Sequence, residues 1–413
     1  MNRIASFLMS CILSLTGIAQ ETVGLKLDDL RSPVIGTSNQ VKFSILAPQA
    51  DNVELEADFL PPITIHTPLG PVTTKGRAKL KKDTNGVWTY VSAPLNPELH
   101  TYCFHVDGIR MTDPNNVYIL RDIATYTNYF LIDGELSANY FIREVPHGTI
   151  SKVWYPSRHL GLPQRRMTVY TPAGYADHPE QKYPVLYLLH GAGGDENSWS
   201  ELGRACQILD NLISQKKAQP MIVVMPNGNG AQEAAPGEYP DSMYRPSFRN
   251  QKTTDGSIEE AFTDIITYVD SHYRTYSDKA HRAIAGLSMG GFHSLYISAN
   301  NPSLFSYVGL FFAAININDR NRYQTSIYTG LDEKLTELFH QGIKDYFIAI
   351  GKGDFLYRDN TAFREKLDRA GYTYTYIETD GGHEWKNWRK YLNWFVPRLF
   401  QEPKQECNQP SPL

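Results

Sequence analysis

The pattern of hydrophobic and polar positions changes about one third of the way along the chain. From about residue 33 to 133, short segments such as Val41–Leu46 alternate between apolar and polar residues. Turn signals, among them Asn85-Gly86 and Asp107-Gly108, separate these segments. Alternation of this kind is typical of strands that bury one face, and both dipeptides favour tight hairpins. The first part of the chain therefore predicts a small all-β sandwich.

Beyond about residue 150, continuous apolar runs alternate with longer amphipathic stretches. The segments Val185–Leu189 and Met221–Met225 are apolar throughout, as expected for parallel strands covered on both faces. Amphipathic segments such as Ile258–Tyr273 predict the helices between strands. We therefore expect an α/β fold with a doubly wound, mostly parallel sheet, preceded by the smaller β-sandwich.

The chain begins with Arg3 and an apolar run that is too short to span a bilayer comfortably. This pattern predicts a secretory signal peptide, and hence a secreted or periplasmic protein. Lipid anchoring at Cys11, within a weak lipoprotein box, is the alternative. The predicted parts are a signal peptide (1–20), the β-sandwich (21–137), a linker and entry strand (138–157), the α/β domain (158–402) and a loose tail (403–413).

The composition narrows the class of protein. The net charge is −4 over 413 residues, without the basic excess of a nucleic-acid-binding protein. No second apolar run has the length of a membrane span. The cysteines after the leader, Cys103, Cys206 and Cys407, contain no C-x-x-C pair and so give no zinc or redox signature. We expect Cys103 and Cys206 to be free, buried thiols.

A G-x-S-x-G pattern, Gly286-Leu287-Ser288-Met289-Gly290, follows an apolar run and precedes a helical pattern of small residues. This strand–turn–helix context is the one in which a nucleophile elbow presents its serine. We predict that Ser288 is a nucleophile. The amide N–H of Met289, at the start of the helix, is expected to point into the space that the Ser288 hydroxyl faces.

Two further candidates follow later predicted strands, first Asp354 and then His383. The order Ser, Asp, His is that of α/β-hydrolases. A serine hydroxyl needs an imidazole to take its proton, and the imidazole needs a carboxylate to fix its tautomer. We therefore predict that His383 is the general acid–base and Asp354 the orienting acid. The rivals of Asp354 are Asp359, Asp380 and Glu384.

A glycine-rich loop, His190-Gly191-Ala192-Gly193-Gly194, follows the apolar run that ends at Leu189. It lacks the G-K-[ST] ending of a phosphate-binding loop. Uncovered amides in such a loop suit an oxyanion hole, which we assign to the N–H groups of Ala192 and Met289. We expect Asp195 and Glu196, next in the chain, to hold the loop rather than to act chemically.

Four motifs, LLHGAGGDENSW, MIVVMPNGN, HRAIAGLSMGG and GGHEW, closely resemble carbohydrate esterase family one. That family includes feruloyl and acetylxylan esterases, and the resemblance covers residues 150 to 400. It implies hydrolysis of esters on xylan side chains, without a metal or cofactor. It also assigns catalytic roles to Ser288, Asp354 and His383 and oxyanion roles to the amides of Met289 and Ala192.

The N-terminal part resembles the immunoglobulin-like module of isoamylase-type enzymes. The resemblance is carried by F-x-I-x-APQA, G-x-W and Y-x-F-x-VDG, in that order, over about one hundred residues. Such modules are often classed as carbohydrate-binding. Trp88 could present a sugar platform, but a tryptophan within a strand is more often a core residue, and we expect the latter.

Residues 227–250 form a long segment with little regular pattern, as in loops that line binding sites. Aromatic residues in this segment and beside the catalytic motifs are candidates for substrate contact: Trp199, Tyr239, Tyr244, Phe248 and Trp385. We expect a secreted feruloyl esterase that forms an acyl-enzyme and acts on feruloylated or acetylated xylan oligosaccharides. The alternatives are an acetylxylan esterase, a siderophore esterase and a non-catalytic carbohydrate-binding protein.

Overall fold

The computed structural model describes residues 30–67, 70–248, 250–316 and 325–401. The predicted signal peptide, Cys11 and Cys407 lie outside these residues. The chain forms two compact units. The first holds the described residues up to Leu120 together with Tyr126–Ile132, and the second holds Arg121–Thr125 and the described residues from Asp133 onward.

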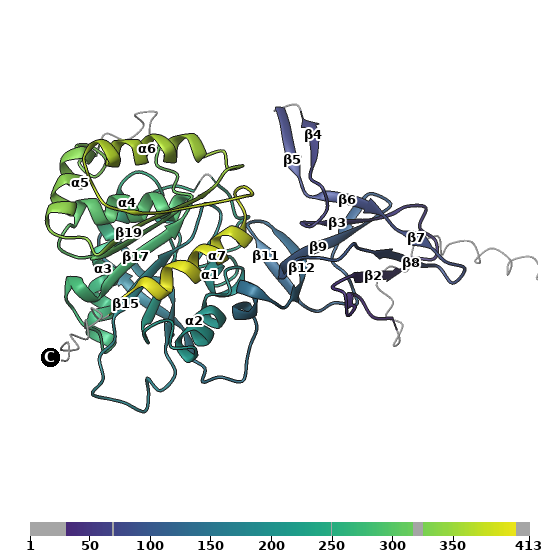
Figure 1. Cartoon of the computed structure of the whole chain (residues 1–413), viewed down its shortest axis with the longest axis horizontal. Coiled ribbons are helices and arrows are strands. Elements are labelled where there is room, and N and C mark those ends of the chain that lie inside the picture. The colour runs from purple at the N-terminus through teal and green to yellow at the C-terminus, as the bar shows by residue number, and fades with distance from the viewer. Residues whose placement is uncertain (1–29, 68–69, 249, 317–324, 402–413) are drawn as a thin grey trace, which may run out of the picture. The chain divides into compact units, whose positions relative to one another are not determined.

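The N-terminal unit is built from strands, as the alternating pattern predicts (Figure 1). One sheet has the order β1 (Val34–Ile35), β2 (Val41–Leu46), β8 (Val87–Val91), β7 (Lys81–Lys82). The other has the order β11 (Ile119–Asp122), β12 (Thr125–Ile132), β9 (Glu98–Val106), β3 (Val53–Ala57), β6 (Gly76–Lys79), with β10 (Ile109–Met111) paired to β9. A separate hairpin joins β4 (Ile63–Thr67) to β5 (Gly70–Thr74).

Inward-facing side chains of both sheets form the core of this unit. The ring of Phe43 on β2 lies 4.8 Å from that of Tyr102 and 5.7 Å from that of Phe130. Trp88 is buried, and its indole N–H donates a 2.8 Å hydrogen bond to the carbonyl of Ala47. The structure therefore places Trp88 in the core, as expected, and not on the surface as a sugar platform.

The second unit contains an eight-stranded sheet. Its order is β13 (Thr149–Ser157), β14 (Leu162–Thr171), β16 (Ile222–Pro226), β15 (Val185–Leu189), β17 (Arg282–Leu287), β18 (Tyr307–Phe311), β19 (Asp345–Gly351), β20 (Thr375–Thr379). β13 and β14 are antiparallel to their neighbours, and the strands from β16 to β20 run parallel. This arrangement confirms the predicted mostly parallel α/β sheet.

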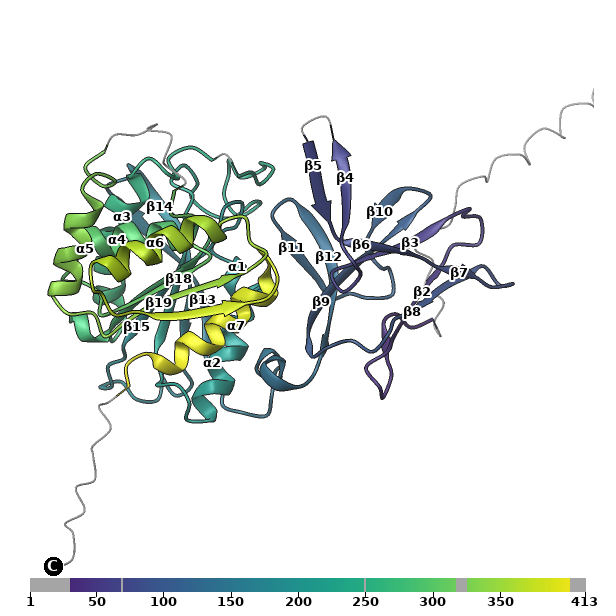
Figure 2. The ribbon, with the colours of Figure 1, turned by 45° about the horizontal axis from the view of Figure 1, so that its top comes forward.

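Helices cover both faces of this sheet, which is why its strands are apolar on both sides (Figures 1 and 2). The helices α3 (Ser257–His272), α4 (Met289–Asn300), α5 (Leu331–His340) and α6 (Tyr357–Arg369) pack on one face. On the other face lie α1 (Ser198–Glu201), α2 (Ala205–Ser214) and α7 (Trp385–Phe395). Short 3₁₀ turns are η1 (Glu135–Tyr140), η2 (Lys279–His281) and η3 (Val396–Arg398). Within the described ranges, no helix is both long and apolar enough to cross a membrane.

Candidate active site

Ser288 occupies a strained turn between β17 and α4. Its backbone has φ 52° and ψ −113°, a conformation that costs free energy for any residue with a side chain. Three hydrogen bonds hold it there: its N–H donates to the carbonyl of Phe311 (2.9 Å), and its carbonyl accepts from the N–H groups of Ala314 (3.0 Å) and Phe292 (3.1 Å). A Cβ on Gly290 would lie 2.5 Å from the carbonyl oxygen of Leu189, so the turn needs glycine there. These are the features of a nucleophile elbow.

Asp354 and His383 form a hydrogen-bonded pair at the ends of the neighbouring strands β19 and β20. Nδ1 of His383 lies 2.7 Å from Oδ2 of Asp354. The other carboxylate oxygen of Asp354 accepts from the N–H of Leu356 at 2.7 Å, and the side chain is fully buried. Because Nδ1 faces the carboxylate, Nε2 is the ring nitrogen left for a substrate or nucleophile.

The rival acids lie elsewhere. The Asp380 side chain is 99% exposed, 3.8 Å from Lys352, and Glu384 lies 3.1 Å from Lys386. Asp359 is in the first turn of α6. Of the four predicted candidates, Asp354 is the one that the structure brings to His383.

The segment after β18 links the two halves of the site. Phe311, the last residue of β18, and Ala314, three residues later, form hydrogen bonds with the N–H and the carbonyl of Ser288. The ring of Phe312, between them, lies 5.7 Å from the imidazole of His383. β17, β18, β19 and β20 are adjacent in the sheet. The structure therefore gathers Ser288, Asp354 and His383 at the carboxyl edge of the sheet, where α/β folds place their binding sites.

Three aromatic rings surround the His383 imidazole, and none of them was among the predicted site residues. The ring of Phe355 lies 4.7 Å away, that of Trp388 5.0 Å and that of Phe312 5.7 Å. Phe312 and Trp388 are buried, whereas Phe355 is 74% exposed. The sequence signal for Phe355 was its position directly after the predicted orienting acid.

The predicted oxyanion loop is held by its own histidine. His190 is buried; its Nδ1 lies 2.8 Å from the carbonyl of Gly191, and its Nε2 accepts from the N–H of Gly228 at 2.7 Å. The imidazole therefore joins the loop after β15 to the loop after β16. Ala192 lies within the turn that the loop makes. Met289 is the first residue of α4, so its N–H has no acceptor within the helix.

Asp195 and Glu196 hold this loop, as expected. Asp195 is buried and pairs with Arg121, which belongs to the same unit. Glu196 accepts from Nε of Arg166 at 2.8 Å and from the side chain of Asn227 at 3.0 Å. Both carboxylates are thus engaged in fixing the loop.

Burial lowers the pKa of His190 to about 4, below the value near 6.5 of an exposed histidine. Between these values the unfolded chain binds the proton and the folded chain does not, so acid favours unfolding. We expect wild type to lose about 2 kcal/mol more unfolding free energy than His190→Gln between pH 7 and pH 5. Denaturant unfolding at both pH values measures this difference, and parallel losses in the two proteins would contradict it.

The prediction that Trp199 contacts substrate is wrong. The side chain is 1% exposed, and its indole N–H donates to the carbonyl of Leu189 at 2.9 Å. Its ring packs against those of Phe311 (6.3 Å) and Trp385 (5.4 Å). Trp199 therefore supports the site from inside the core.

The other predicted substrate contacts have different surroundings. The hydroxyl of Tyr244 donates to Oε1 of Gln232 at 2.8 Å, so this ring packs the long loop on itself. Tyr239 and Trp385 are half-buried, and Phe248 is exposed. Contact of these residues with a substrate stays a prediction.

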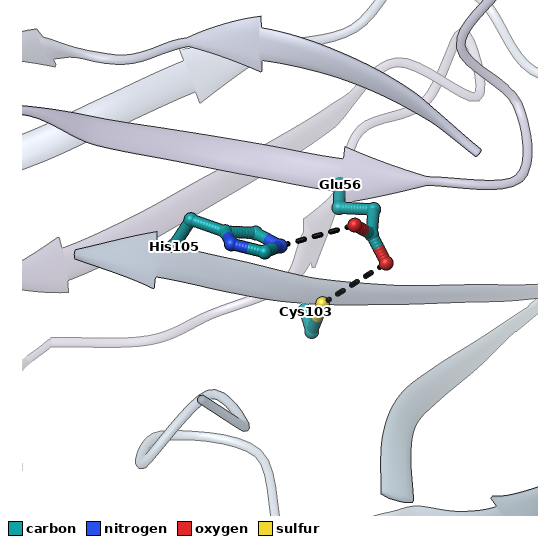
Figure 3. A group of neighbouring side chains, drawn as sticks. All are labelled: Glu56, Cys103 and His105. Atoms are coloured by element: carbon teal, nitrogen blue, oxygen red, sulfur yellow. Dashed lines mark hydrogen bonds and ion pairs between the residues drawn. The ribbon is translucent and has the colours of Figure 1, made fainter. Parts of the chain in front are cut away.

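One cluster in the N-terminal unit, Glu56, Cys103 and His105, has the donor types of a metal site (Figure 3). Its carboxylate is already in use: Oε2 lies 3.0 Å from Nε2 of His105 and 3.2 Å from a guanidinium nitrogen of Arg77, and Oε1 lies 3.8 Å from Nε of Arg110. Burial and the charge of Glu56 raise the pKa of the Cys103 thiol to about 12. Two guanidinium groups and a neutral thiol disfavour a cation, and we interpret the cluster as a hydrogen-bonded ion-pair network.

Both described cysteines, Cys103 and Cys206, are free and buried, as expected.

Known proteins are similar to this chain in sequence and in fold. The chain is 28% identical over 377 residues to an endo-1,4-beta-xylanase/feruloyl esterase of Xylanibacter ruminicola. The matched region covers 89% of this chain and 46% of that protein. It is 31% identical over 154 residues to endo-1,4-beta-xylanase Y of Acetivibrio thermocellus, covering 35% of this chain and 12% of that protein. The chain thus spans less than half the length of these two relatives.

Solved structures give the same picture. A CE1 ferulic acid esterase from Anaeromyces mucronatus, in complex with ferulic acid, superposes with a TM-score of 0.51 at 26% identity, covering 64% of this chain and 95% of that one. The enterobactin esterase of Shigella flexneri has a TM-score of 0.59 at 16% identity, covering 87% of this chain and 92% of that one, and shares the fold. A family model described as putative esterase matches residues 162–399. This match includes more than half of the 413 residues, and the chain therefore belongs to the putative esterase family, with an α/β-hydrolase fold.

Proposed function

We propose that this protein is a serine esterase that hydrolyses carboxylic esters through an acyl-enzyme. The observation that carries the proposal is the 2.7 Å pair between Asp354 and His383 at the same sheet edge as the strained Ser288. Ser288 is the nucleophile, His383 the general acid–base and Asp354 the residue that orients the imidazole. The family to which the chain belongs supports these roles.

In the first half-reaction, Nε2 of His383 takes the hydroxyl proton of Ser288 as Oγ attacks the ester carbonyl carbon. The carbonyl oxygen becomes an oxyanion, which the N–H groups of Met289 and Ala192 stabilise. The tetrahedral intermediate collapses, the bond to the leaving oxygen breaks, and His383 returns its proton to the departing alcohol. Water then attacks the acyl-enzyme by the same route, which releases the acid and regenerates the serine.

The substrate class that we propose is a feruloyl ester on an arabinoxylan side chain. Support comes from the relative named as a xylanase/feruloyl esterase and from the ferulic acid esterase structure. Exposed phenylalanines at 248 and 355 offer apolar surface for a substrate with an aromatic acid and a sugar. The predicted signal peptide would deliver the enzyme outside the cytoplasm, and a carbohydrate-binding role for the N-terminal unit remains part of this proposal.

Turnover of methyl ferulate compared with methyl acetate tests the proposed substrate. An aromatic acyl group gains affinity from apolar contacts that an acetyl group lacks, so we expect kcat/KM to be at least about tenfold higher for methyl ferulate. A preference for acetate would remove the feruloyl assignment and favour an acetylxylan esterase. Absence of turnover with both esters would remove the hydrolase assignment.

A further inference from the structure

We propose that Phe355 forms the subsite for the leaving alcohol, with its ring as a platform for the sugar that departs from the ester. This inference rests on the proposed esterase function and extends it to the substrate's alcohol side. The expected ligand is a pentose that carries the ester on a hydroxyl group.

The position of Phe355 sets it apart from the other rings of the site. Its centroid lies 4.7 Å from the His383 imidazole at an interplanar angle of 48°. The other two rings on the imidazole, those of Phe312 and Trp388, are buried and therefore support the histidine from within. With 74% of its surface exposed, Phe355 has a free face that a substrate can cover.

Local hydrogen bonds fix the backbone that carries this ring. The side chain of Asp354 accepts from the N–H of Leu356 at 2.7 Å, and the backbone carbonyl of Asp354 accepts from the N–H of Tyr357 at 3.0 Å. Phe355 therefore sits in a turn that is closed by the same carboxylate that orients His383. A fixed backbone with two side-chain torsions loses little conformational entropy when a ligand binds.

The chemistry of the reaction decides which part of the substrate meets this ring. The general acid must deliver its proton to the leaving oxygen, so the departing alcohol lies against the imidazole. The acyl oxygen lies at the oxyanion amides of Met289 and Ala192 instead. A ring on the open side of His383 is therefore placed for the alcohol, and the C–H face of a sugar supplies the apolar surface that an aromatic ring buries.

Exposure also makes the proposal testable, because truncating an exposed side chain leaves no cavity. The chain offers a matched control in Tyr276, which is partly exposed and stacks on His281 at 4.3 Å. These two residues precede β17 and so lie at the opposite edge of the sheet from the proposed site. Loss of Tyr276 removes an aromatic ring from a histidine without affecting the esterase site.

The test is the ratio of kcat/KM for a feruloylated arabinose oligosaccharide to kcat/KM for methyl ferulate, which share the acyl group and differ in the alcohol. We expect Phe355→Ala to lower this ratio by about tenfold, from the loss of one aromatic contact. Phe355→Trp should restore it, and Tyr276→Ala should leave it unchanged.

An unchanged ratio in Phe355→Ala, with or without parallel losses on both esters, would overturn the inference, because the ring would then serve the acyl group or the histidine alone. In that case wild-type turnover of methyl ferulate would leave the proposed function standing. Failure of the wild type to hydrolyse either feruloyl ester would overturn both.

Discussion

Replacing Ser288 with alanine should lower kcat/KM for ester hydrolysis by a factor of about 10⁴ to 10⁶. The substitution removes the oxygen that forms the acyl-enzyme. Water is then the only nucleophile that can attack an ester bound at the oxyanion amides. Alanine keeps the Cβ of serine, so the backbone strain at φ 52° is the same in the variant as in the wild type. The fold should therefore be retained. Initial rates on methyl ferulate measure the loss.

The matched control is Ser271→Ala, an exposed serine on α3, which should keep wild-type rates. A fluorophosphonate probe adds a second readout, because it labels an activated serine covalently. Intact-mass measurement should show one adduct on wild type and on Ser271→Ala, and none on Ser288→Ala. Equal rates or equal labelling of Ser288→Ala and wild type would contradict the role of Ser288.

Much of the second unit could be predicted from the sequence because its strands are buried on both faces. The apolar run Val185–Leu189 gives β15 with the same bounds, and the amphipathic segment Ile258–Tyr273 gives α3 (Ser257–His272). The catalytic motifs could be predicted for a different reason, which is the glycines that they contain. A strained serine turn and a histidine after the last strand need glycines at fixed spacing, and these glycines are visible in the sequence.

Other features depend on contacts between distant segments, which no local pattern reports. By contrast, one difference has a local cause: the sequence from Glu384 to Phe400 predicts a single closing helix, but α7 ends at Phe395, because Pro397 cannot continue the helix and a 3₁₀ turn follows. Trp199 lies near a catalytic motif in sequence but is buried between rings of two other segments. Phe355 gains its significance only from the ring of His383, 28 residues further along the chain.

The carboxylate partner of His383 makes the sharpest test of the geometry. Asp354→Asn should lower kcat/KM by about 10⁴ with little change in melting temperature. In the folded protein, Oδ1 of Asp354 accepts from the N–H of Leu356 while Oδ2 faces Nδ1 of His383. An asparagine that keeps the first bond turns its NH₂ group toward the imidazole. Nδ1 then has to accept, the ring proton moves to Nε2, and that nitrogen can no longer take the proton of Ser288.

The control for this variant is Asp380→Asn, which removes a carboxylate three residues before His383 whose side chain is 99% exposed. Solvent screening keeps its influence on the imidazole small, so its kcat/KM should stay within about twofold of wild type. Steady-state kinetics on methyl ferulate, with thermal melts of both variants, separate the two residues. A large loss in Asp380→Asn together with a small one in Asp354→Asn would assign the orienting role to Asp380 and overturn the triad derived from the 2.7 Å contact.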